Sequence, residues 1–460
     1  MNSSSMPLQD LIFERLKEKP HPLFIFKDTI IPAATIWIGV RAWVNFFREN
    51  GIKSGDRILL AYPESPAFLH ILYAAIWEKL TIAIIRADNL DLPHINKIKP
   101  SLIISNKQIE NSISPDEMGM PPKRININKK EIPSDPKIRF ILQSSGSTGN
   151  PKYICLSEES IEHVIQTHSK IIESSKSISL SILPWSHCFG LVLDLFLTTF
   201  YSDTIIRDSR SGRDIDSIFE NFEKYHVTHF SSVPLVIERI LAKEKGIQLL
   251  SSLESGIIGG APISKKLSES LSSTKLRVGY GQTEASPGIC LGEKGFFREN
   301  YLGSELGCDV ILSDSHELLF RGKNAFLGYW KGNSIEYIPN NSWIRSGDIV
   351  EKKQEGYFFR GRLDFAFKLP NGLMIQPEEL EESLAANSDL SQCLLYFKDK
   401  VYIFYNSKNK TSKEDSILKN IPTILKNYVI QITQLPETNW FYSPKGGIDR
   451  KKMLTSLNLY

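Results

Sequence analysis

The stretch QSSGSTGNPK, residues 143–152, decides how the rest of this 460-residue chain is interpreted. The apolar run Phe140–Leu142 comes directly before it, so the pattern predicts a strand that ends in a glycine-rich turn. Glycines let backbone N–H groups approach a ligand closely, and hydroxyls add further donors. The residues of these two kinds are Ser144, Ser145, Gly146, Ser147, Thr148 and Gly149. With the positive charge of Lys152 beside them, the turn suits a polyphosphate.

This turn differs from a Walker A phosphate loop. The Gly-Lys-Ser/Thr ending of that motif is missing, and Pro151 stands immediately before Lys152. A proline at this position also argues against a helix that runs through the lysine. A surface loop without any ligand can have the same composition, so other segments must decide between the two interpretations.

Length and composition set the class of the protein. About 100–200 residues per domain predicts two to four structural units. Hydrophobic residues make up 41% of the chain and charged residues 23%, which is typical of a globular protein with a large core. The net charge of +3 gives no reason to expect nucleic acid or a membrane surface as partner.

Targeting and redox features are plain. The N-terminal segment MNSSSMPLQDLIFERLKEKP lacks the basic start and apolar core of a secretory signal. The longest stretch of low charge, Ser177–Leu193, contains a proline and a histidine and precedes Asp194, so we expect a core segment and no transmembrane segment. The five cysteines are dispersed without a Cys-x-x-Cys pair. These features predict a cytoplasmic protein with reduced thiols and no zinc site.

Helical and strand patterns alternate in the first part of the chain. Apolar residues recur at helical spacing in Thr35–Asn50, and Ser65–Leu80 is predicted to be a helix capped by its first residue. Asp56–Tyr62 and the β-branched runs at residues 80–85 and 101–105 are predicted strands. Such alternation predicts an α/β fold with a largely parallel sheet covered on both faces.

Further elements follow the same alternation. Residues 107–136 are expected to form a surface connection, and Glu158–Ser169 is predicted to be a helix capped by Ser157. Residues 177–200 combine a strand, a tight LPWSH turn and an apolar helix. His226–Val233 is predicted to be another strand, ended by a proline.

Two glycine-containing turns carry candidate ligand contacts. In the segment ESGIIGGAP, the turn formed by Gly259, Gly260 and Ala261 follows a strand, where open α/β sheets bind ligands, although an ordinary strand–helix turn has the same pattern. In VGYGQTEAS, residues 278–286, a Gly-Tyr-Gly turn would bring Tyr280 into position to stack on a purine.

The residues after that tyrosine offer oxygen ligands. Thr283 supplies a hydroxyl and Glu284 a carboxylate, which suit a phosphate and a divalent cation. Mg²⁺ prefers one carboxylate together with phosphate oxygens and waters. In the later segment WIRSGDIV, Asp348 can accept hydrogen bonds from both hydroxyls of a ribose. Arg362, in GYFFRGRLD, is available for ribose or phosphate.

Four of these segments together resemble the adenylate-forming (AMP-binding) superfamily of acyl-CoA synthetases, peptide-synthetase adenylation domains and luciferases. SSGSTGNPK is similar to its phosphate-binding signature, LPWSHCFG to the motif at the mouth of its acyl tunnel, and YGQTE to its Tyr-Gly-x-Thr-Glu signature. WIRSGDIV resembles its aromatic-x-Arg-Thr-Gly-Asp-Leu motif, with Ser346 in place of threonine. The resemblance extends over about residues 30–453, in the order of the family.

The resemblance implies a domain organisation. It implies an α/β fold with a large N-terminal adenylation domain, residues 1–363, made of parallel-rich sheets covered by helices plus a β-rich subdomain. A small mobile α+β domain, residues 364–460, would follow a hinge at Asp364. The segment KLPNGLMIQPEELEESL is closest to long-chain fatty acyl members, so a fatty acid is the expected substrate.

The resemblance also implies the site and its chemistry. ATP would bind with Mg²⁺ at Glu284, its β,γ-phosphates held by the phosphate loop and Lys152, and a carboxylic acid facing His187 would be adenylated. Coenzyme A, or the pantetheine of an acyl carrier protein, would then take the acyl group. The implied nucleotide contacts also include the main chain of Gly259, Gly260, Ala261 and Gly281.

One position departs from the family. The family pattern has a lysine that binds the reacting carboxylate and the α-phosphate, directly before the position of Ile448. In SPKGGIDRKKM this position holds Gly447. Lys445 or Lys451 is close enough in sequence to be a substitute, and Lys445 on the Gly-Gly loop is our candidate catalytic residue.

Three alternatives stay open at this point. The missing lysine favours a nucleotide-binding pseudoenzyme that acts as a partner or regulator. Among ligases, an aryl or amino acid is the alternative to a fatty acid, and Asp194 is the carboxylate near LPWSHCFG that could receive an ammonium group. A luciferase-like oxygenase has no separate support in the sequence.

Overall fold

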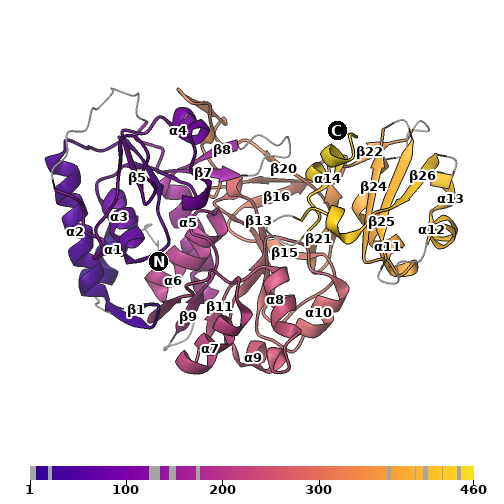
Figure 1. Cartoon of the computed structure of the whole chain (residues 1–460), viewed down its shortest axis with the longest axis horizontal. Helices are drawn as coiled ribbons and strands as arrows, with labels where there is room; N and C mark the ends of the chain where they lie inside the picture. Colours follow the sequence, from indigo (N-terminus) through magenta and orange to yellow (C-terminus); the bar gives the residue numbers. More distant parts are fainter. Residues whose placement is uncertain are drawn as a thin grey trace.

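The computed structural model describes residues 7–18, 23–123, 135–144, 152–171, 177–369, 374–398, 400–407, 413–426, 428–442 and 447–459. Three sheets with their covering helices form a large body that holds most of the chain (Figure 1). The elements from β22 to the C-terminus form a smaller body beside it, drawn in yellow tones. The predicted boundary at residue 364, between a large domain and a small mobile one, stays a prediction.

The first sheet holds the strands that flank the Ser-Gly turn. Its order is β19-β18-β8-β7-β4-β3-β5-β6, and the strands β4, β3, β5, β6 and β7 run parallel to their neighbours in this group. Strand β8 is antiparallel to β7, and β18 to β8. The predicted α/β sheet is therefore confirmed, with an antiparallel edge added. The bounds are β3 Arg57–Ala61, β4 Thr81–Ile84, β5 Leu102–Ser105, β6 Ser112–Ile113, β7 Phe140–Ser144, β8 Lys152–Leu156, β18 Gly328–Trp330 and β19 Ile335–Tyr337.

Helices cover this sheet as the periodicity predicts. In α2 (Ala33–Glu49) the residues at helical spacing, which include Ile36 and Trp43, are fully buried. Burying one such side chain contributes about 1.5–3 kcal/mol, so the stripe fixes the helix to the core. Helix α3 (Pro66–Trp77) begins where Ser65 Oγ accepts the N–H of Phe68, at 3.4 Å, so the predicted cap is confirmed.

The second sheet has the order β11-β9-β10-β1-β2. Its strands are β1 Leu23–Phe26, β2 Thr29–Pro32, β9 Ile178–Ser181, β10 Thr204–Arg207 and β11 His229–Phe230. The prediction of a strand over His226–Val233 is wrong at its start. His226 instead ends helix α7 (Ile215–Tyr225) in the left-handed conformation, with φ of 53°, which no strand can continue. The apolar helix after LPWSH is the π-helix η4 (Gly190–Phe196), followed by α6 (Leu197–Tyr201).

The third sheet is largely antiparallel and forms the predicted β-rich part. Its order is β12-β13-β14-β15-β21-β20-β17-β16, and only the β12–β13 pair is parallel. The bounds are β12 Ile257–Gly259, β13 Arg277–Gly281, β14 Gly288–Leu291, β15 Tyr301–Glu305, β16 Asp309–Leu312, β17 Glu317–Arg321, β20 Ile344–Lys353 and β21 Gly356–Arg362. The YGQTE and SGD motifs therefore belong to one sheet.

The smaller body has its own sheet, β24-β25-β26, with buried residues on both faces. Strands β24 (Gln392–Phe397) and β25 (Val401–Asn406) form the predicted hairpin, and β26 (Val429–Gln434) pairs parallel with β25. The remaining elements are β22 Phe367–Lys368, β23 Met374–Ile375, α11 Pro377–Asn387, α12 Glu414–Asn420, α13 Thr423–Lys426 and α14 Arg450–Ser456. This sheet with helices is the predicted α+β module.

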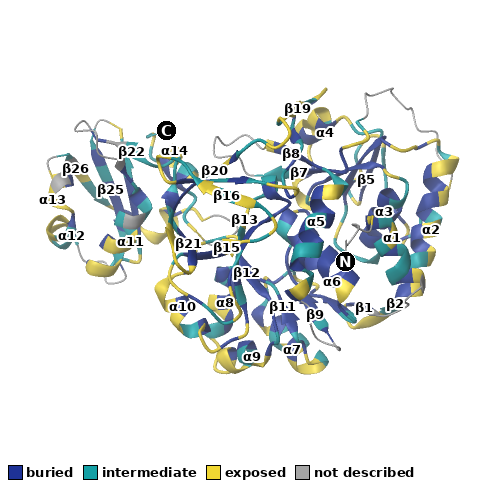
Figure 2. Cartoon of the chain, turned by 180° about the vertical axis from the view of Figure 1, so that it is seen from behind, coloured by how far each residue is buried: buried dark blue, intermediate teal, exposed yellow. Residues whose placement is uncertain are grey.

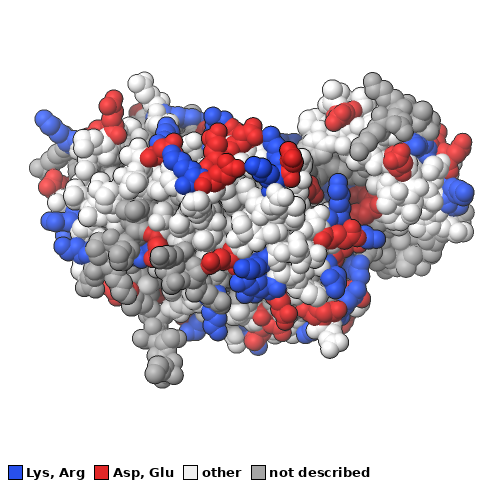
Figure 3. Space-filling view, turned by 90° about the horizontal axis from the view of Figure 1, so that it is seen from below, with Lys and Arg blue, Asp and Glu red and all other residues white. Residues whose placement is uncertain are grey.

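Burial separates strands from helix surfaces throughout the molecule. Figure 2 shows the strands mostly dark blue and the outer faces of the helices yellow. On the face shown in Figure 3, basic and acidic side chains are interspersed, in keeping with the small net charge of +3. Within the described residues, no helix has the length and apolarity needed to cross a membrane.

Candidate active site

The two ends of the Ser-Gly turn lie side by side. Strands β7 and β8 are antiparallel, and Ser144 is paired with Lys152 in their register. Lys152 is exposed at the start of strand β8, so no helix runs through it, as the proline before it predicts. The turn residues Ser145, Gly146, Ser147, Thr148 and Gly149 lie outside the described residues. The structure thus fixes the place of the turn through its two ends.

Lys152 and Glu284 meet at one aromatic side chain. The Lys152 Nζ lies 5.6 Å from the centroid of the Tyr329 ring, within the range of a cation–π contact. The Tyr329 hydroxyl donates to Glu284 Oε1 at 3.3 Å. Burial raises the pKa of the Tyr329 phenol, and the charge of Glu284 raises it further, so the phenol remains a donor. The phosphate-loop lysine and the YGQTE carboxylate are therefore brought together.

Tyr329 is a site residue that sequence reasoning missed. It lies in β18, which pairs antiparallel with β8, and this pairing places its ring beside Lys152. The sequence ELLFRGKNAFLGYW predicts strands and turns there but gives no signal for this pairing. A main-chain hydrogen bond also joins the segment before β18 to the YGQTE segment, because Phe326 N donates to the carbonyl oxygen of Glu284 at 2.9 Å.

The ribose candidate Asp348 lies in a second cluster. Its Oδ2 accepts the Tyr280 hydroxyl at 2.6 Å, and its Oδ1 accepts Arg362 Nη1 at 2.6 Å. Burial raises the pKa of Tyr280, with a further contribution from the charge of Asp348, so this phenol also remains protonated. Arg362 Nη2 in turn donates to the predicted hinge residue Asp364 at 3.2 Å. Four predicted residues from three segments thus form one hydrogen-bonded cluster.

Asp348 retains acceptor capacity for a ligand. An ionised carboxylate has about four lone-pair sites, and the two hydrogen bonds above occupy two of them. Gly347 before it has φ of +76°, and a Cβ there would lie 2.8 Å from Arg362 Nη2. Glycine is therefore required for the arginine to reach this carboxylate.

The two clusters are the two ends of one segment. Tyr280 of the Asp348 cluster and Glu284 of the Lys152 cluster are separated by four residue steps, which span at most about 14 Å. The short 3₁₀ turn Thr283–Ala285 shortens this path further. The segment Tyr280–Glu284 therefore connects the sugar-binding candidate to the phosphate-binding candidate along one side of the third sheet.

The Gly-Gly-Ala turn adjoins the same segment. Gly259 ends β12 and pairs with Gly279 of β13, directly before Tyr280. A Cβ on Gly259 would lie 2.7 Å from the Gly279 carbonyl oxygen and 3.6 Å from Phe189 Cε1, so this strand pair tolerates no side chain there. Gly260 follows with φ of +87°, and Ala261 is half-buried. The turn therefore begins beside the strand that carries Tyr280.

The LPWSHCFG segment also lies near these residues. Phe189 packs near Gly259, and Cys188 lies within electrostatic range of Glu284. Burial raises the pKa of the Cys188 thiol, and the charge of Glu284 adds to this. His187 is exposed, so it is not the packed core histidine that an apolar setting favours. Trp185, in contrast, is fully buried.

A magnesium ion fits the residues present. Glu284 is a half-buried carboxylate beside the cationic Lys152, and the hydroxyl of Thr283 is its neighbour. Mg²⁺ in nucleotide sites commonly takes one or two carboxylates together with phosphate oxygens and waters. Among the described residues there is no group of three or more His, Cys, Asp or Glu side chains that could hold a metal ion. A single carboxylate is thus what the site offers a phosphate-bound cation.

The C-terminal motif is described only in part. Lys445 lies outside the described residues. Gly447 is exposed, and a Cβ built on it meets nothing within 4 Å. Lys451 is half-buried in α14. The position that the family pattern gives to lysine is therefore a surface position with room for a longer side chain.

Comparison with known proteins adds independent information. A family model described as "AMP-binding enzyme" matches residues 34–330. The feruloyl-CoA synthase of an Amycolatopsis species is 24% identical over 412 residues, which cover 82% of this chain and 83% of that protein. A long-chain-fatty-acid–CoA ligase of Yersinia pestis is 25% identical over 274 residues, 54% of this chain and 48% of that protein.

Solved structures share the fold. The crystal structure of ATP-bound MatB from Rhodopseudomonas palustris superposes with a TM-score of 0.81 at 17% sequence identity. The superposition covers 99% of both chains. The chain therefore shares its fold with that structure.

Proposed function

Because this chain belongs to the AMP-binding enzyme family, which includes the AMP-forming acid–CoA ligases, we propose that it activates a carboxylic acid with ATP. A carboxylate oxygen attacks the α-phosphorus of ATP, the bond to the β-phosphate oxygen breaks, and pyrophosphate leaves. The sulfur of coenzyme A, or of a carrier protein's phosphopantetheine, then attacks the acyl carbon. AMP leaves, and the thiol proton is released.

The observation that carries this proposal is the segment Tyr280–Glu284. Through Tyr280 it contacts Asp348, and through Glu284 and Tyr329 it is linked to Lys152. An acceptor for a ribose and a cation for a polyphosphate thus lie at the two ends of a short stretch, as one nucleotide requires. A lone Ser-Gly surface loop would not produce this arrangement.

Each residue has a role in the proposed reaction. Lys152 and the phosphate loop neutralise the charge that develops on the leaving pyrophosphate, and Asp348 and Arg362 hold the ribose. Bound Mg²⁺ would neutralise phosphate charge, held by Glu284 with Thr283 beside it. Such chemistry depends on positioning and electrostatics more than on covalent participation of side chains.

We propose a fatty acid as substrate, with an aryl acid as the alternative. The Lys-Leu-x-Asn-Gly form of residues 368–372 supports the former, while a curated relative acts on feruloyl groups by its name. An amino acid is disfavoured. Its expected partner, Asp194, is 1% exposed, and its Oδ2 already accepts Ser181 Oγ at 2.7 Å and Leu183 N at 3.0 Å.

The direct test is ATP–pyrophosphate exchange with fatty and aryl acids of graded length. We expect exchange with at least one acid, and a Lys152→Ala variant with the same fold should lose most of it. Coenzyme A and a phosphopantetheine carrier protein, added separately, would then show which thiol accepts the acyl group. Failure of every acid to support exchange would count against catalysis.

The second candidate function is a nucleotide-binding pseudoenzyme, and Gly447 favours it. Loss of an electrostatic clamp on the reacting carboxylate costs several kcal/mol in a transition state. Because Gly447 is exposed with open space around it, the Gly447→Lys variant can accept the longer side chain. Exchange that appears only in Gly447→Lys would identify a pseudoenzyme.

If the wild type is active, the lysine substitutes become testable. We propose that Lys445 takes the missing role when residues 364–460 rotate as a unit about Asp364. Lys445→Ala should then abolish exchange while Lys451→Ala leaves it largely intact. The reverse outcome would assign the role to Lys451.

A further inference from the structure

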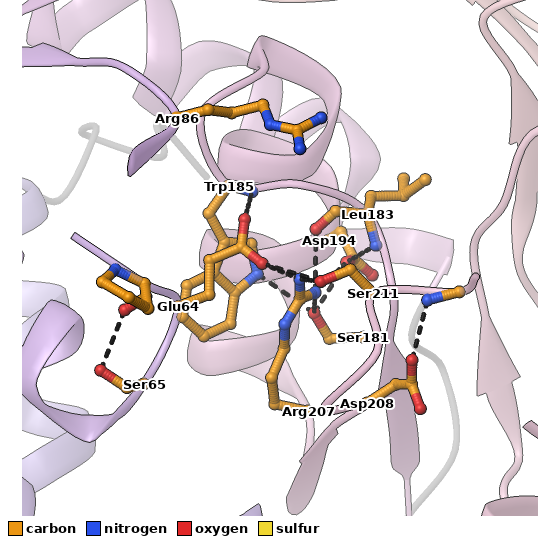
Figure 4. A network of polar contacts seen from close by, with 12 residues as sticks. Glu64, Ser65, Arg86, Ser181, Leu183, Trp185, Asp194, Arg207, Asp208 and Ser211 are labelled. Carbon is orange, nitrogen blue, oxygen red and sulfur yellow. Dashed lines mark hydrogen bonds and ion pairs between the residues drawn. The ribbon is translucent and has the colours of Figure 1, made fainter. Parts of the chain in front are cut away.

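Three charged side chains hold the LPWSH turn from beneath (Figure 4). Leu183 N donates to Asp194 Oδ2 at 3.0 Å, and the Leu183 carbonyl accepts Arg207 Nη1 at 2.9 Å. Trp185 N donates to Glu64 Oε1 at 2.7 Å. Pro184, between them, has no N–H to offer. We call Glu64, Asp194 and Arg207 the turn clamp.

The members of the turn clamp come from three separate parts of the fold. Glu64 precedes helix α3, Asp194 lies in the π-helix η4, and Arg207 ends strand β10. Arg207 and Asp194 are buried, whereas the Glu64 side chain is 18% exposed. Arg207 forms an ion pair with Glu64 and lies 3.9 Å from Asp194 Oδ2. One cation thus connects two carboxylates that grip the turn on either side of its proline.

The hydroxyl of Ser181 completes the arrangement. It donates to Asp194 at 2.7 Å and accepts both Arg207 Nη1 and Trp185 Nε1 at 3.1 Å. The Arg207 guanidinium also lies 4.8 Å from the centroid of the Trp185 ring. Buried charges require such full satisfaction, because their desolvation is otherwise uncompensated. The turn is therefore held in one geometry.

The rest of the turn transmits this geometry to His187. The His187 N–H donates to the Pro184 carbonyl at 3.1 Å, and the His187 carbonyl accepts Leu191 N at 2.8 Å. A Cβ on Gly190 would lie 2.0 Å from that same Pro184 carbonyl oxygen, so the turn closes tightly on glycine. Of the next two residues, Phe189 lies beside Gly259, and Cys188 lies within electrostatic range of Glu284.

From this geometry we infer that Glu64, Asp194 and Arg207 are positioning residues for the acid substrate. They fix the backbone of Leu183 and Trp185, and so set where His187 meets the carboxylate to be adenylated. This inference rests on the proposed function. The turn clamp makes no contact among the described residues with Lys152, Asp348 or Glu284, so ATP binding does not depend on it directly.

Glu64 is the member to change, because its partial exposure leaves the folded state least disturbed. Glu64→Ala removes the acceptor of Trp185 N and the exposed partner of Arg207. Glu64→Gln keeps an amide oxygen for Trp185 N and serves as the conservative rescue. Asp208→Asn is the matched control for loss of a nearby buried carboxylate charge. Asp208 is 1% exposed and follows Arg207, and asparagine keeps an oxygen for Gly212 N, so the loop that carries Ser211, whose hydroxyl bonds Arg207 and Glu64, stays closed.

The kinetic test separates the acid from the nucleotide. A misplacement of about 1 Å can reduce a rate on the order of 100-fold. We expect Glu64→Ala to lower kcat/KM for the acid in ATP–pyrophosphate exchange by about ten- to 100-fold, with the KM for ATP within about twofold of the wild type. Glu64→Gln should recover most of this loss, and Asp208→Asn should change neither constant.

Hydrogen exchange of a peptide over residues 182–189, followed by mass spectrometry, gives a readout that needs no activity. The Trp185 amide should exchange faster in Glu64→Ala and at the wild-type rate in Asp208→Asn. Unchanged hydrogen exchange of the Trp185 amide in Glu64→Ala would overturn the positioning role while the ligase function stands. An equal effect on the kinetic constants for the acid and for ATP would overturn it too. An inactive wild type would instead refute the proposed function, and the positioning role with it.

Discussion

The nucleotide-side motifs and the C-terminal GGIDR motif differ in what their polar side chains contact. In the large body, Asp348 accepts hydrogen bonds from Tyr280 and Arg362 and keeps acceptor sites for a ligand. In the small body, Arg450 is enclosed: its Nη1 lies 2.6 Å from both oxygens of Glu381, and its Nη2 donates to the Leu395 carbonyl at 2.6 Å.

The GGIDR motif thus contains residues that stabilise the small body and one position that is expected to take part in the reaction. Asp449 caps helix α14 by accepting Lys452 N at 3.1 Å, and Arg450 packs 4.9 Å from the Phe365 ring centroid. These residues build the small body and join it to the segment after Asp364. Gly447, two positions before Asp449, has open surroundings. The structural half of the motif is thus present, while the position expected to do chemistry carries no side chain.

The largest expected effect falls on the small body. Glu381→Ala leaves the Arg450 guanidinium buried without its carboxylate, which costs about 3–5 kcal/mol of unfolding free energy. Hydrogen exchange of β24–β26 should accelerate accordingly, while ATP affinity stays near that of the wild type. The exposed change Asp389→Asn is the control, because asparagine tolerates the left-handed backbone of this residue (φ of 53°), and it should alter stability by less than about 0.5 kcal/mol. Loss of ATP affinity in Glu381→Ala would contradict the distinction between the nucleotide-side motifs and the structural part of the GGIDR motif.

Asp348→Asn should have the converse effect. It removes the charge that holds Arg362 and Tyr280 and that would bind the ribose. The rate of ATP–pyrophosphate exchange should therefore fall on the order of 10²–10³-fold. The melting temperature should change less than in Glu381→Ala, because asparagine keeps an oxygen acceptor at this buried position. Asp309→Asn is the matched control, as it breaks an exposed pair with Arg321 at 3.0 Å in the same sheet. Equal activity of Asp348→Asn and wild type would contradict the assignment.

The sequence predicts those parts of the fold and site that depend on local patterns. The stripe of α2, the Ser65 and Ser157 caps, the parallel sheet and the C-terminal hairpin are all confirmed. Each rests on residues within one or two turns of each other, or on the alternation of strands and helices. The strand over His226–Val233 fails because a left-handed helix end has no period to detect.

Long-range pairing is what the sequence could not provide. Tyr329 reaches Lys152 only because β18 pairs with β8. Glu64 and Arg207 meet the LPWSH turn only because α3, η4 and β10 converge beneath it. No local spacing records such contacts between segments far apart in the chain, and strand register alone determines which side chains face each other.

Gly347→Ala should perturb both sides of the nucleotide site moderately. At φ of +76° a Cβ is strained, and it would press on Arg362 Nη2 from 2.8 Å. We expect a loss of about 1–3 kcal/mol in stability, and weaker ATP binding because the Arg362–Asp348 bond must lengthen. Scanning calorimetry measures the loss in stability, and calorimetric titration with ATP measures the change in binding. Gly51→Ala, also at positive φ but with nothing within 4 Å, controls for backbone strain alone.

The smallest effect should come from Tyr329, where the ring and the hydroxyl can be separated. Tyr329→Phe keeps a ring beside Lys152 and removes the 3.3 Å hydrogen bond to Glu284, so exchange should fall only about two- to tenfold, the equivalent of about 0.5–1.5 kcal/mol. Tyr329→Leu removes both contacts, so the rate of ATP–pyrophosphate exchange should fall further. If the two variants were equal, the cation–π contact would contribute nothing, and the link between Lys152 and Glu284 would be the hydrogen bond alone.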